Sequence, residues 1–438
     1  MELATTVTLA ALGVVLLATI RRDVAVLLAA GVTTALNLLV PVSRMEPDIL
    51  RFVVPLTGLA LAAIAAVRTP GWMKWMTLPV AYLSFTGVVA LTQSGFLLWL
   101  LSAATLISGT VLGTALRSSD RVDRFAAVFA WFAAALGVAA TLEYALGWPP
   151  AWRGAVINAD GTSYPLHQVL IAGTRAQATL GHPLPLSTIL VLALAVLLLH
   201  RTRHQVMRAI GIVAVTAGLI AAGSRNALIL AVGLVLFLAA RRLTTMRVPA
   251  FAAIFVAALV GLVWASETEF TGTGSYTHRI EAMESVTNLL TERSPVEVIF
   301  GSTAGGVPEL YARGLLQSDG LEAIDNQYVH TFAADGLIGV LMLGAIGALA
   351  FVRATPHGRI LIGVLATQGM IFDYLAWPPT ALIAWIIFSS ALSRTPDPPR
   401  GAPAVAAPRW EPREHRALLV AAPDRAATES RHVLSKAF

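Results

Sequence analysis

The 438-residue sequence contains no cysteine, which excludes disulfide bonds, zinc–thiolate sites and thiol nucleophiles. Lysine is nearly absent, because Lys74 and Lys436 are the only lysines among 31 basic residues. The sequence also lacks a D-x-D pair for a metal-bound nucleotide sugar, a phosphate-loop lysine, and any cluster of His and Asp at metal-ligand spacing. We therefore expect any chemistry to proceed without metal, cofactor or ATP.

Charge is scarce as well. Charged residues make up 13% of the chain and hydrophobic residues 56%, and the mean hydropathy is +0.72. A bilayer core of about 30 Å needs about twenty apolar residues per helix, so the chain has room for roughly a dozen spans. This composition predicts an all-α polytopic membrane protein with 12 or 13 transmembrane helices.

Thirteen apolar runs are candidates for these helices. They lie at about 3–20, 24–42, 52–67, 76–92, 95–116, 125–147, 184–200, 209–223, 226–240, 249–264, 330–352, 359–375 and 377–393. We assign residues 1–393 to one transmembrane domain. Residues 394–438 are rich in Pro, Ala and Arg with little apolar periodicity, which predicts a disordered cytoplasmic tail.

The basic residues predict the orientation. If Arg21 and Arg22 are cytoplasmic and the spans alternate, most of the 31 basic residues fall on the inner side, as the positive-inside rule requires. The sequence pI near 10 is then a topological signal and not a sign of nucleic-acid binding. The two long polar loops, 148–185 and 265–329, fall outside, together with the turn at 223–226.

The second loop precedes the last spans and should contain short helices. Residues 278–292 carry Ile280, Met283, Val286 and Leu290 at helical spacing, which predicts an amphipathic helix. The VEVIFG segment after Pro295 is interpreted as a short extended piece.

Two arginines on the outer side run against the positive-inside bias. Arg225 interrupts an otherwise apolar hairpin, and Arg279 lies in the predicted first turn of its helix, where the helix dipole disfavours a cation. A guanidinium binds phosphate oxygens in a bidentate fashion, so both are candidate phosphate ligands. The alternatives are lipid contact for Arg225 and a salt bridge to Glu281 or Glu284 for Arg279.

Arg175 is a third candidate phosphate contact. It precedes His182 and Pro183, where the next predicted helix begins. We include His182 among the candidate binding residues, although a structural hydrogen bond is its simpler role.

A further group of polar residues lies where the second loop returns to the membrane. Asp325 and His330 are candidate catalytic bases, and Asn326 is a candidate substrate contact. Asp325 also suits the N-cap of the following helix. Asp335 lies inside the apolar run, where a carboxylate is costly without a partner, so we expect it to pair with an arginine or a backbone N–H.

Four segments in this order resemble the O-antigen ligase and polymerase superfamily. They are R-x6-HP (175–183), GSRNALILAVGLVL (223–236), the Arg279-to-Glu284 segment of the predicted amphipathic helix (279–284), and DNQYVHTFAADGLIG (325–339). The resemblance covers roughly residues 120–390. It implies metal-free transfer of glycans from an undecaprenyl-diphosphate carrier on the outer face of the bacterial plasma membrane, with Arg225 and Arg279 holding the diphosphate.

One departure separates this chain from the ligases. Ligases of the superfamily have a His directly before the Asn of the last motif, whereas this chain has Asp325 before Asn326. The departure favours a polymerase over a ligase. The acceptor would be a growing glycan or a lipid, and Asp325 is favoured over His330 as the base. The alternatives are a polysaccharide or lipid flippase, and a scaffold without catalysis.

Overall fold

The computed structural model describes residues 20–40, 49–69, 73, 76–92, 96–148, 175–200, 204–240, 274–317 and 323–393. Among these residues the regular structure is helical and no β-strand is present. The helices are α2 (Arg22–Leu39), α3 (Ile49–Val67), α4 (Thr77–Thr92), α5 (Phe96–Ser118), α6 (Val122–Leu146), α7 (Pro183–Leu199), α8 (Gln205–Ala222), α9 (Arg225–Ala240), α11 (Gly274–Thr291), α12 (Pro295–Phe300), α13 (Thr303–Ala312), α14 (Gln327–Arg353), α15 (Pro356–Gly369) and α16 (Pro378–Leu392).

The apolar runs of the sequence coincide with these helices. Each predicted span that falls on described residues is helical over most of its length. By length and composition, α2, α6, α8, α14 and the Trp99–Ser118 part of α5 could each cross a membrane. Other apolar helices are shorter, at 10–17 residues. The predicted spans 3–20 and 249–264, most of loop 148–185 and the tail from 394 lie outside the described residues.

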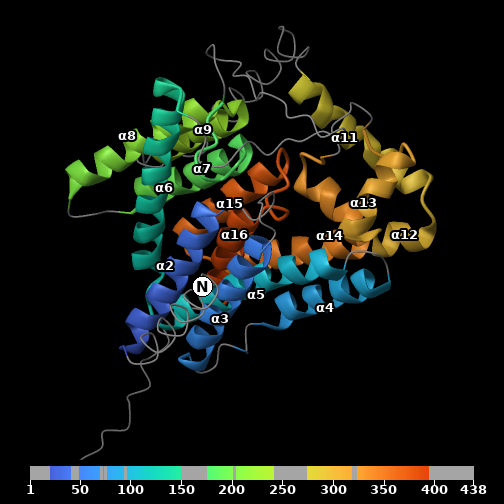
Figure 1. Ribbon diagram of the computed structural model, residues 1–438, viewed down its shortest axis with the longest axis horizontal. Helices are drawn as coiled ribbons and strands as arrows, with labels where there is room; N and C mark the ends of the chain where they lie inside the picture. The colour runs from blue at the N-terminus through green and yellow to red at the C-terminus, as the bar shows by residue number, and fades with distance from the viewer. Residues whose placement is uncertain are drawn as a thin grey trace, which may run out of the picture. The chain divides into compact units, whose positions relative to one another are not determined.

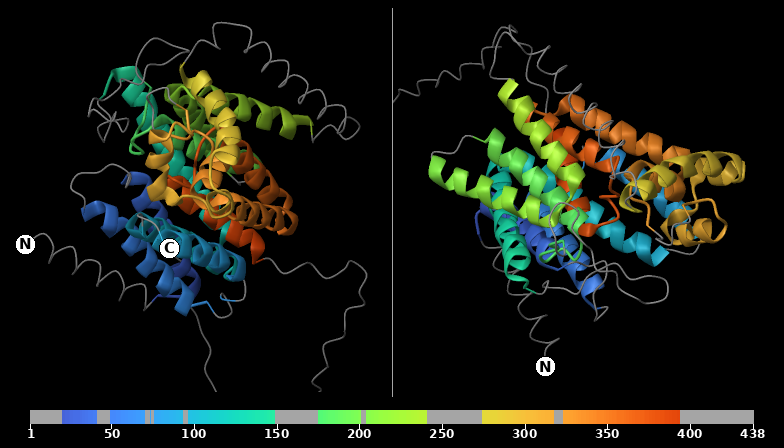
Figure 2. Two further views of the ribbon diagram at one scale, coloured as in Figure 1. Left: turned by 90° about the vertical axis from the view of Figure 1, so that its right-hand side faces the viewer. Right: turned by 90° about the horizontal axis from the view of Figure 1, so that it is seen from above.

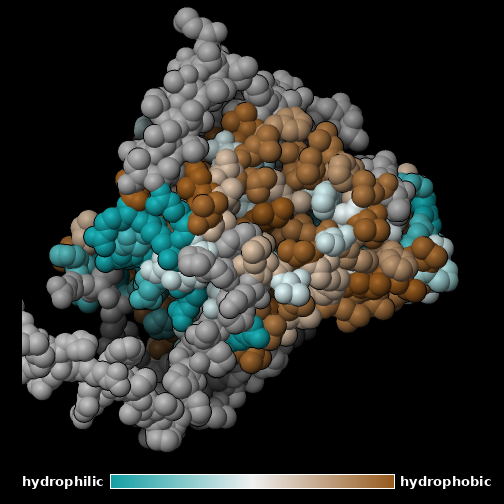
Figure 3. All heavy atoms as spheres, turned by 90° about the horizontal axis from the view of Figure 1, so that it is seen from below, coloured by the Kyte–Doolittle hydropathy of each residue, from teal (hydrophilic) through white to brown (hydrophobic). Residues whose placement is uncertain are grey.

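The surface agrees with a membrane protein. Large apolar side chains such as Val213, Val232 and Leu341 are more than half exposed. Figure 3 shows a broad area of hydrophobic side chains on one face, with hydrophilic groups gathered at its sides. A continuous apolar surface of this kind marks a region that is covered by lipid or by another protein.

The buried hydrophobic residues of the described helices form one large cluster and a smaller separate one around α11, α13 and the first part of α14. Figures 1 and 2 show α6, α7, α8 and α9 side by side, and α11, α12 and α13 next to α14. Helix α7 is central, because every residue from Pro183 to Leu197 is buried. Helices α6 and α8 cross at two glycines, where a Cβ atom on Gly218 would lie 2.5 Å from the Cα of Gly137. Small residues of this kind let membrane helices approach closely.

Two predictions about local structure were wrong, and one feature, the break in α14, was not predicted. The segment after Ser294 is helix α12, because Ser294 and Glu297 form a reciprocal capping box, which overrides the β preference of its Val and Ile residues. Helix α11 begins at Gly274, so Arg279 lies in its second turn. Helix α14 is broken at Gly336, whose φ of 67° is not helical.

Candidate functional site

The segment that carries Arg175 is held in place by hydrogen bonds to α8 and α6. The Nε of Arg175 donates to the Ala222 carbonyl at the end of α8 (3.0 Å), and the Ala176 N–H donates to the Ala221 carbonyl. The Glu143 carboxylate of α6 accepts from the N–H groups of Gln177 and Ala178. Because these bonds fix the backbone, Arg175 is positioned beside the turn between α8 and α9.

His182 ends this segment as the N-cap of α7. Its Nδ1 accepts a hydrogen bond from the Leu184 N–H at 3.2 Å, and its ring lies 5.3 Å from that of Trp377. The cap satisfies an N–H group that the helix leaves without a partner. This geometry agrees with the simpler role considered for His182, a structural hydrogen bond.

Arg225 and Arg279 reach the same region from α9 and α11. Arg225 is the first residue of α9, directly after the turn that ends α8. The guanidinium of Arg279 lies 3.7 Å from the Asp325 carboxylate, and both side chains are about one-fifth exposed. The predicted alternative partners of Arg279, Glu281 and Glu284, are not the residues it pairs with.

The charges of these four residues interact. Arg175 lies close enough to Arg225, Arg279 and Asp325 for each of them to influence its titration. Burial lowers the pKa of Arg175 to about 10, and burial also lowers the pKa of Arg279. With a pKa of about 10, the Arg175 guanidinium remains protonated at neutral pH.

The site carries an excess of positive charge. Arg279 is paired with Asp325, and Arg175 and Arg225 each lie close enough to Arg279 for its positive charge to lower their pKa values. The Nε of Arg279 is buried and has no hydrogen-bond partner among the described residues. A buried donor without a partner costs about 1–3 kcal/mol. An anion with several oxygen atoms would remove both penalties.

Asn326 caps α14, so the prediction of Asp325 as the cap was wrong. The Asn326 side chain accepts from the N–H groups of Tyr328 and Val329 and donates to the Met370 carbonyl. Asn326 is buried in these contacts, so its first role is structural. Asp325 is thereby released from capping and faces Arg279.

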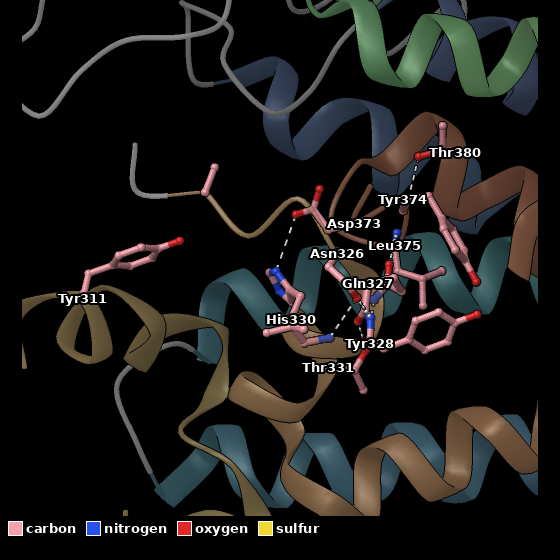
Figure 4. Close-up of polar contacts among 12 residues, drawn as sticks. Tyr311, Asn326, Gln327, Tyr328, His330, Thr331, Asp373, Tyr374, Leu375 and Thr380 are labelled. Carbon is pink, nitrogen blue, oxygen red and sulfur yellow. Dashed lines mark hydrogen bonds and ion pairs between the residues drawn. The ribbon is translucent and has the colours of Figure 1, made fainter. Parts of the chain in front are cut away.

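His330 lies one turn further along α14 and has a different partner. Its Nδ1 is 3.5 Å from the Asp373 carboxylate, which belongs to the loop between α15 and α16 (Figure 4). The same loop is fixed to α14 by Gln327, whose side-chain oxygen accepts from the Leu375 N–H at 2.7 Å. A carboxylate on one ring nitrogen orients an imidazole and leaves its other nitrogen for proton transfer. Hydropathy placed Asp373 at the end of a span and gave no signal of this pairing.

His330 lines a cavity of about 370 Å³. The cavity is bounded by α3, α4, α5, α14 and α16 and by the start of α13. Its polar lining includes Tyr82, Gln327, Thr331 and Asp335, and its apolar lining includes Trp99 and Trp385. This size and mixture are typical of small-molecule sites.

Asp335 faces this cavity with a partner that was not predicted. The Tyr82 hydroxyl of α4 donates to its carboxylate at 2.9 Å. The prediction of an arginine or a backbone N–H as this partner was therefore wrong. Tyr82 is 253 positions away in the sequence, so no local pattern could have identified it.

Arg293 is a functional-region residue that the sequence did not indicate. It is 5% exposed and donates to the Phe332 and Ala333 carbonyls and to the Ser302 hydroxyl. These carbonyls end the first part of α14, where the break at Gly336 leaves them without helical N–H partners. Arg293 thus stabilises the half-helix that carries His330.

Comparison with known proteins does not assign the chain to a family. No protein-family model matches the sequence, and no curated protein matches it. The resemblance to the O-antigen ligase and polymerase superfamily rests on the four sequence segments described above.

Proposed function

We propose that this protein is a membrane glycosyltransferase that polymerises or transfers glycan from a polyprenyl-diphosphate-linked donor, at the outer face of the bacterial plasma membrane. The observation that carries the proposal is the clustering of Arg175, Arg225 and Arg279, with Arg279 paired to Asp325, five residues before the cavity-lining His330 in the chain. A diphosphate supplies the oxygen-rich anion that this arginine cluster favours.

The proposed reaction is a displacement at the anomeric carbon of the donor sugar. An acceptor sugar hydroxyl attacks this carbon and transfers its proton to His330. The bond between the anomeric carbon and the phosphate oxygen breaks, and its electron pair leaves on the polyprenyl diphosphate. The arginine cluster stabilises the charge that builds on this leaving group, where preorganised donors have their largest effect.

His330 replaces Asp325 as the favoured base. Asp325 is paired with Arg279 and lies beside Arg175, so its carboxylate is engaged as a partner of these cations. His330 has Asp373 to orient it and lines the cavity that would hold the acceptor. We assign Asp325 the role of orienting Arg279.

A flippase is the second candidate, favoured by one observation. Transporters place their substrate sites at broken membrane helices, and α14 is broken next to Asp335. In this chain, however, the freed carbonyls are bonded by Arg293 and Ser302, which gives the break a structural role.

The proposal is tested by reconstitution in proteoliposomes with a diphosphate-linked oligosaccharide donor, without ATP. We expect elongated or transferred glycan and an equal amount of released polyprenyl diphosphate, measured by mass spectrometry. Movement of intact donor across the bilayer without its cleavage would contradict the enzyme proposal and support the flippase.

The orientation is tested with cysteines in this cysteine-free chain. We expect Ser275→Cys to react with an impermeant maleimide in cells with a permeabilised outer wall, and Ser435→Cys to be protected. The reverse pattern would place the arginine cluster in the cytoplasm and contradict the proposal.

A further inference from the structure

A second cavity of about 370 Å³ lies at the opposite ends of α6 and α7 from the arginine cluster. The arginine cluster is fixed by Glu143 near the end of α6 and lies near His182 at the start of α7. The second cavity instead contacts Val122 at the start of α6 and His200 after the end of α7. It is therefore separate from the proposed active site.

The interior of this cavity is apolar. It is lined by Phe125, Phe129, Leu192, Val196, Ile383 and Ile386, each at most 6% exposed. These side chains offer no hydrogen bond to water, and cavities of this kind stay dry or take up hydrocarbon. The interior suits an alkyl chain.

The rim of the cavity is polar and carries both signs of charge. It contains Arg117, Asp120, Asp123, His200 and His357, at the ends of α5, α6, α7 and α15. His200 lies 3.1 Å from the Asp123 carboxylate, and its ring is 5.8 Å from that of His357. The polar groups lie where the apolar helices end, which is the level at which a bilayer changes from hydrocarbon to headgroups.

Two of these charges are not neutralised within the described part of the chain. Neither the Arg117 guanidinium nor the Asp120 carboxylate forms a side-chain hydrogen bond or ion pair with another described residue. The start of α15 lies at the same rim, and the positive end of its helix dipole favours an anion. The rim thus presents a cationic and an anionic position side by side.

We propose that this cavity binds one zwitterionic phospholipid, with an acyl chain in the apolar interior. The phosphate would lie at Arg117 and the start of α15, and the ammonium group at Asp120 and Asp123. Charge complementarity selects this occupant, because an anionic headgroup would meet the two carboxylates and an uncharged one would leave both signs without a partner. The inference does not depend on the glycosyltransferase proposal.

The test uses the purified full-length protein in nanodiscs that contain phosphatidylethanolamine with a photoreactive acyl chain. We expect labelling at residues 122–129 and 383–391, located by mass spectrometry of peptides. Ala126→Trp fills the cavity and should remove this labelling, whereas Ala139→Trp, on an exposed position of α6, should leave it intact.

The headgroup is tested separately with Arg117→Gln combined with Asp120→Asn, at a half-buried and an exposed position where folding is not at risk. We expect the concentration of phosphatidylethanolamine needed for half-maximal labelling to rise about tenfold, which corresponds to the loss of one good polar contact. Phosphatidylglycerol carrying the same chain should label these peptides less.

Three results would overturn the inference. One is labelling spread evenly over the apolar surface and unchanged by Ala126→Trp, which would indicate surrounding bilayer lipid only. The second is equal labelling by phosphatidylglycerol, which would remove the charge argument. The third is a complete lack of labelling at the cavity peptides.

Discussion

The roles of Asp325 and His330 are separated by replacing each side chain with a neutral amide. Asp325→Asn removes a carboxylate that lies 3.7 Å from Arg279. The Coulomb energy at that distance is about 4 kcal/mol at an effective dielectric constant of about 20, and measured exposed pairs contribute about 1 kcal/mol or less. Asp325 and Arg279 are each about one-fifth exposed, so this pair lies between the two figures, and only the part that positions Arg279 affects the rate of transfer.

We therefore expect Asp325→Asn to lower the rate of glycan transfer by about tenfold or less, through poorer positioning of Arg279. His330→Gln removes the proposed base, and loss of a general base typically costs about 10²–10⁴-fold. The measurement is single-turnover transfer in proteoliposomes with saturating donor. Asp325→Asn should also leave α14 capped, because Asn326 provides the cap.

The unfolding midpoint of each variant in detergent serves as the control for folding. The reasoning would be refuted if Asp325→Asn abolished transfer while His330→Gln kept near-normal turnover. Asp373→Asn is a further check. This variant should reduce transfer less than His330→Gln does, and the double variant should be little worse than His330→Gln alone, because Asp373 is proposed to act through His330.

Two further predictions concern the arginines and the break in α14. Arg225→Lys and Arg279→Lys keep the charge but lose the planar guanidinium, so we expect each variant to lose most transfer activity. Arg313→Lys is the control, because Arg313 is paired with Glu297, and this variant should retain activity. Full activity in both Arg225→Lys and Arg279→Lys would contradict the diphosphate-binding role. Gly336→Ala should lower the unfolding free energy by about 2 kcal/mol or more, because φ is 67° and the new Cβ would lie 2.4 Å from the Ile299 carbonyl oxygen. Gly347→Ala, at a position with no atom within 4 Å, is the matched control, and equal unfolding midpoints for the two variants would contradict this account.

Hydropathy alone determined where most helices lie. The apolar runs have no other low-energy state in a bilayer, because a backbone in hydrocarbon must satisfy its own hydrogen bonds. The cost of placing charge near a membrane singled out Arg225 and Arg279, and the position of Arg175 before a helix start made it a third candidate. The structure then brought all three to one place.

Some local errors were avoidable from the sequence. Ser294 and Glu297 have the spacing of a capping box, and this local pattern is by itself sufficient to indicate helix α12. The choice between Asp325 and Asn326 as the cap was not decided locally, because both residue types suit that position. In the structure Asn326 is the cap, and its side chain also donates a hydrogen bond to the Met370 carbonyl, 44 residues away.

Only the tertiary structure decided the partners of the buried polar groups. Tyr82 for Asp335, Asp373 for His330, and the α14 carbonyls for Arg293 are contacts between distant segments. A sequence shows that a buried charge needs compensation but not which side chain provides it. That depends on how the helices pack, and packing is set by many weak contacts that no single motif encodes.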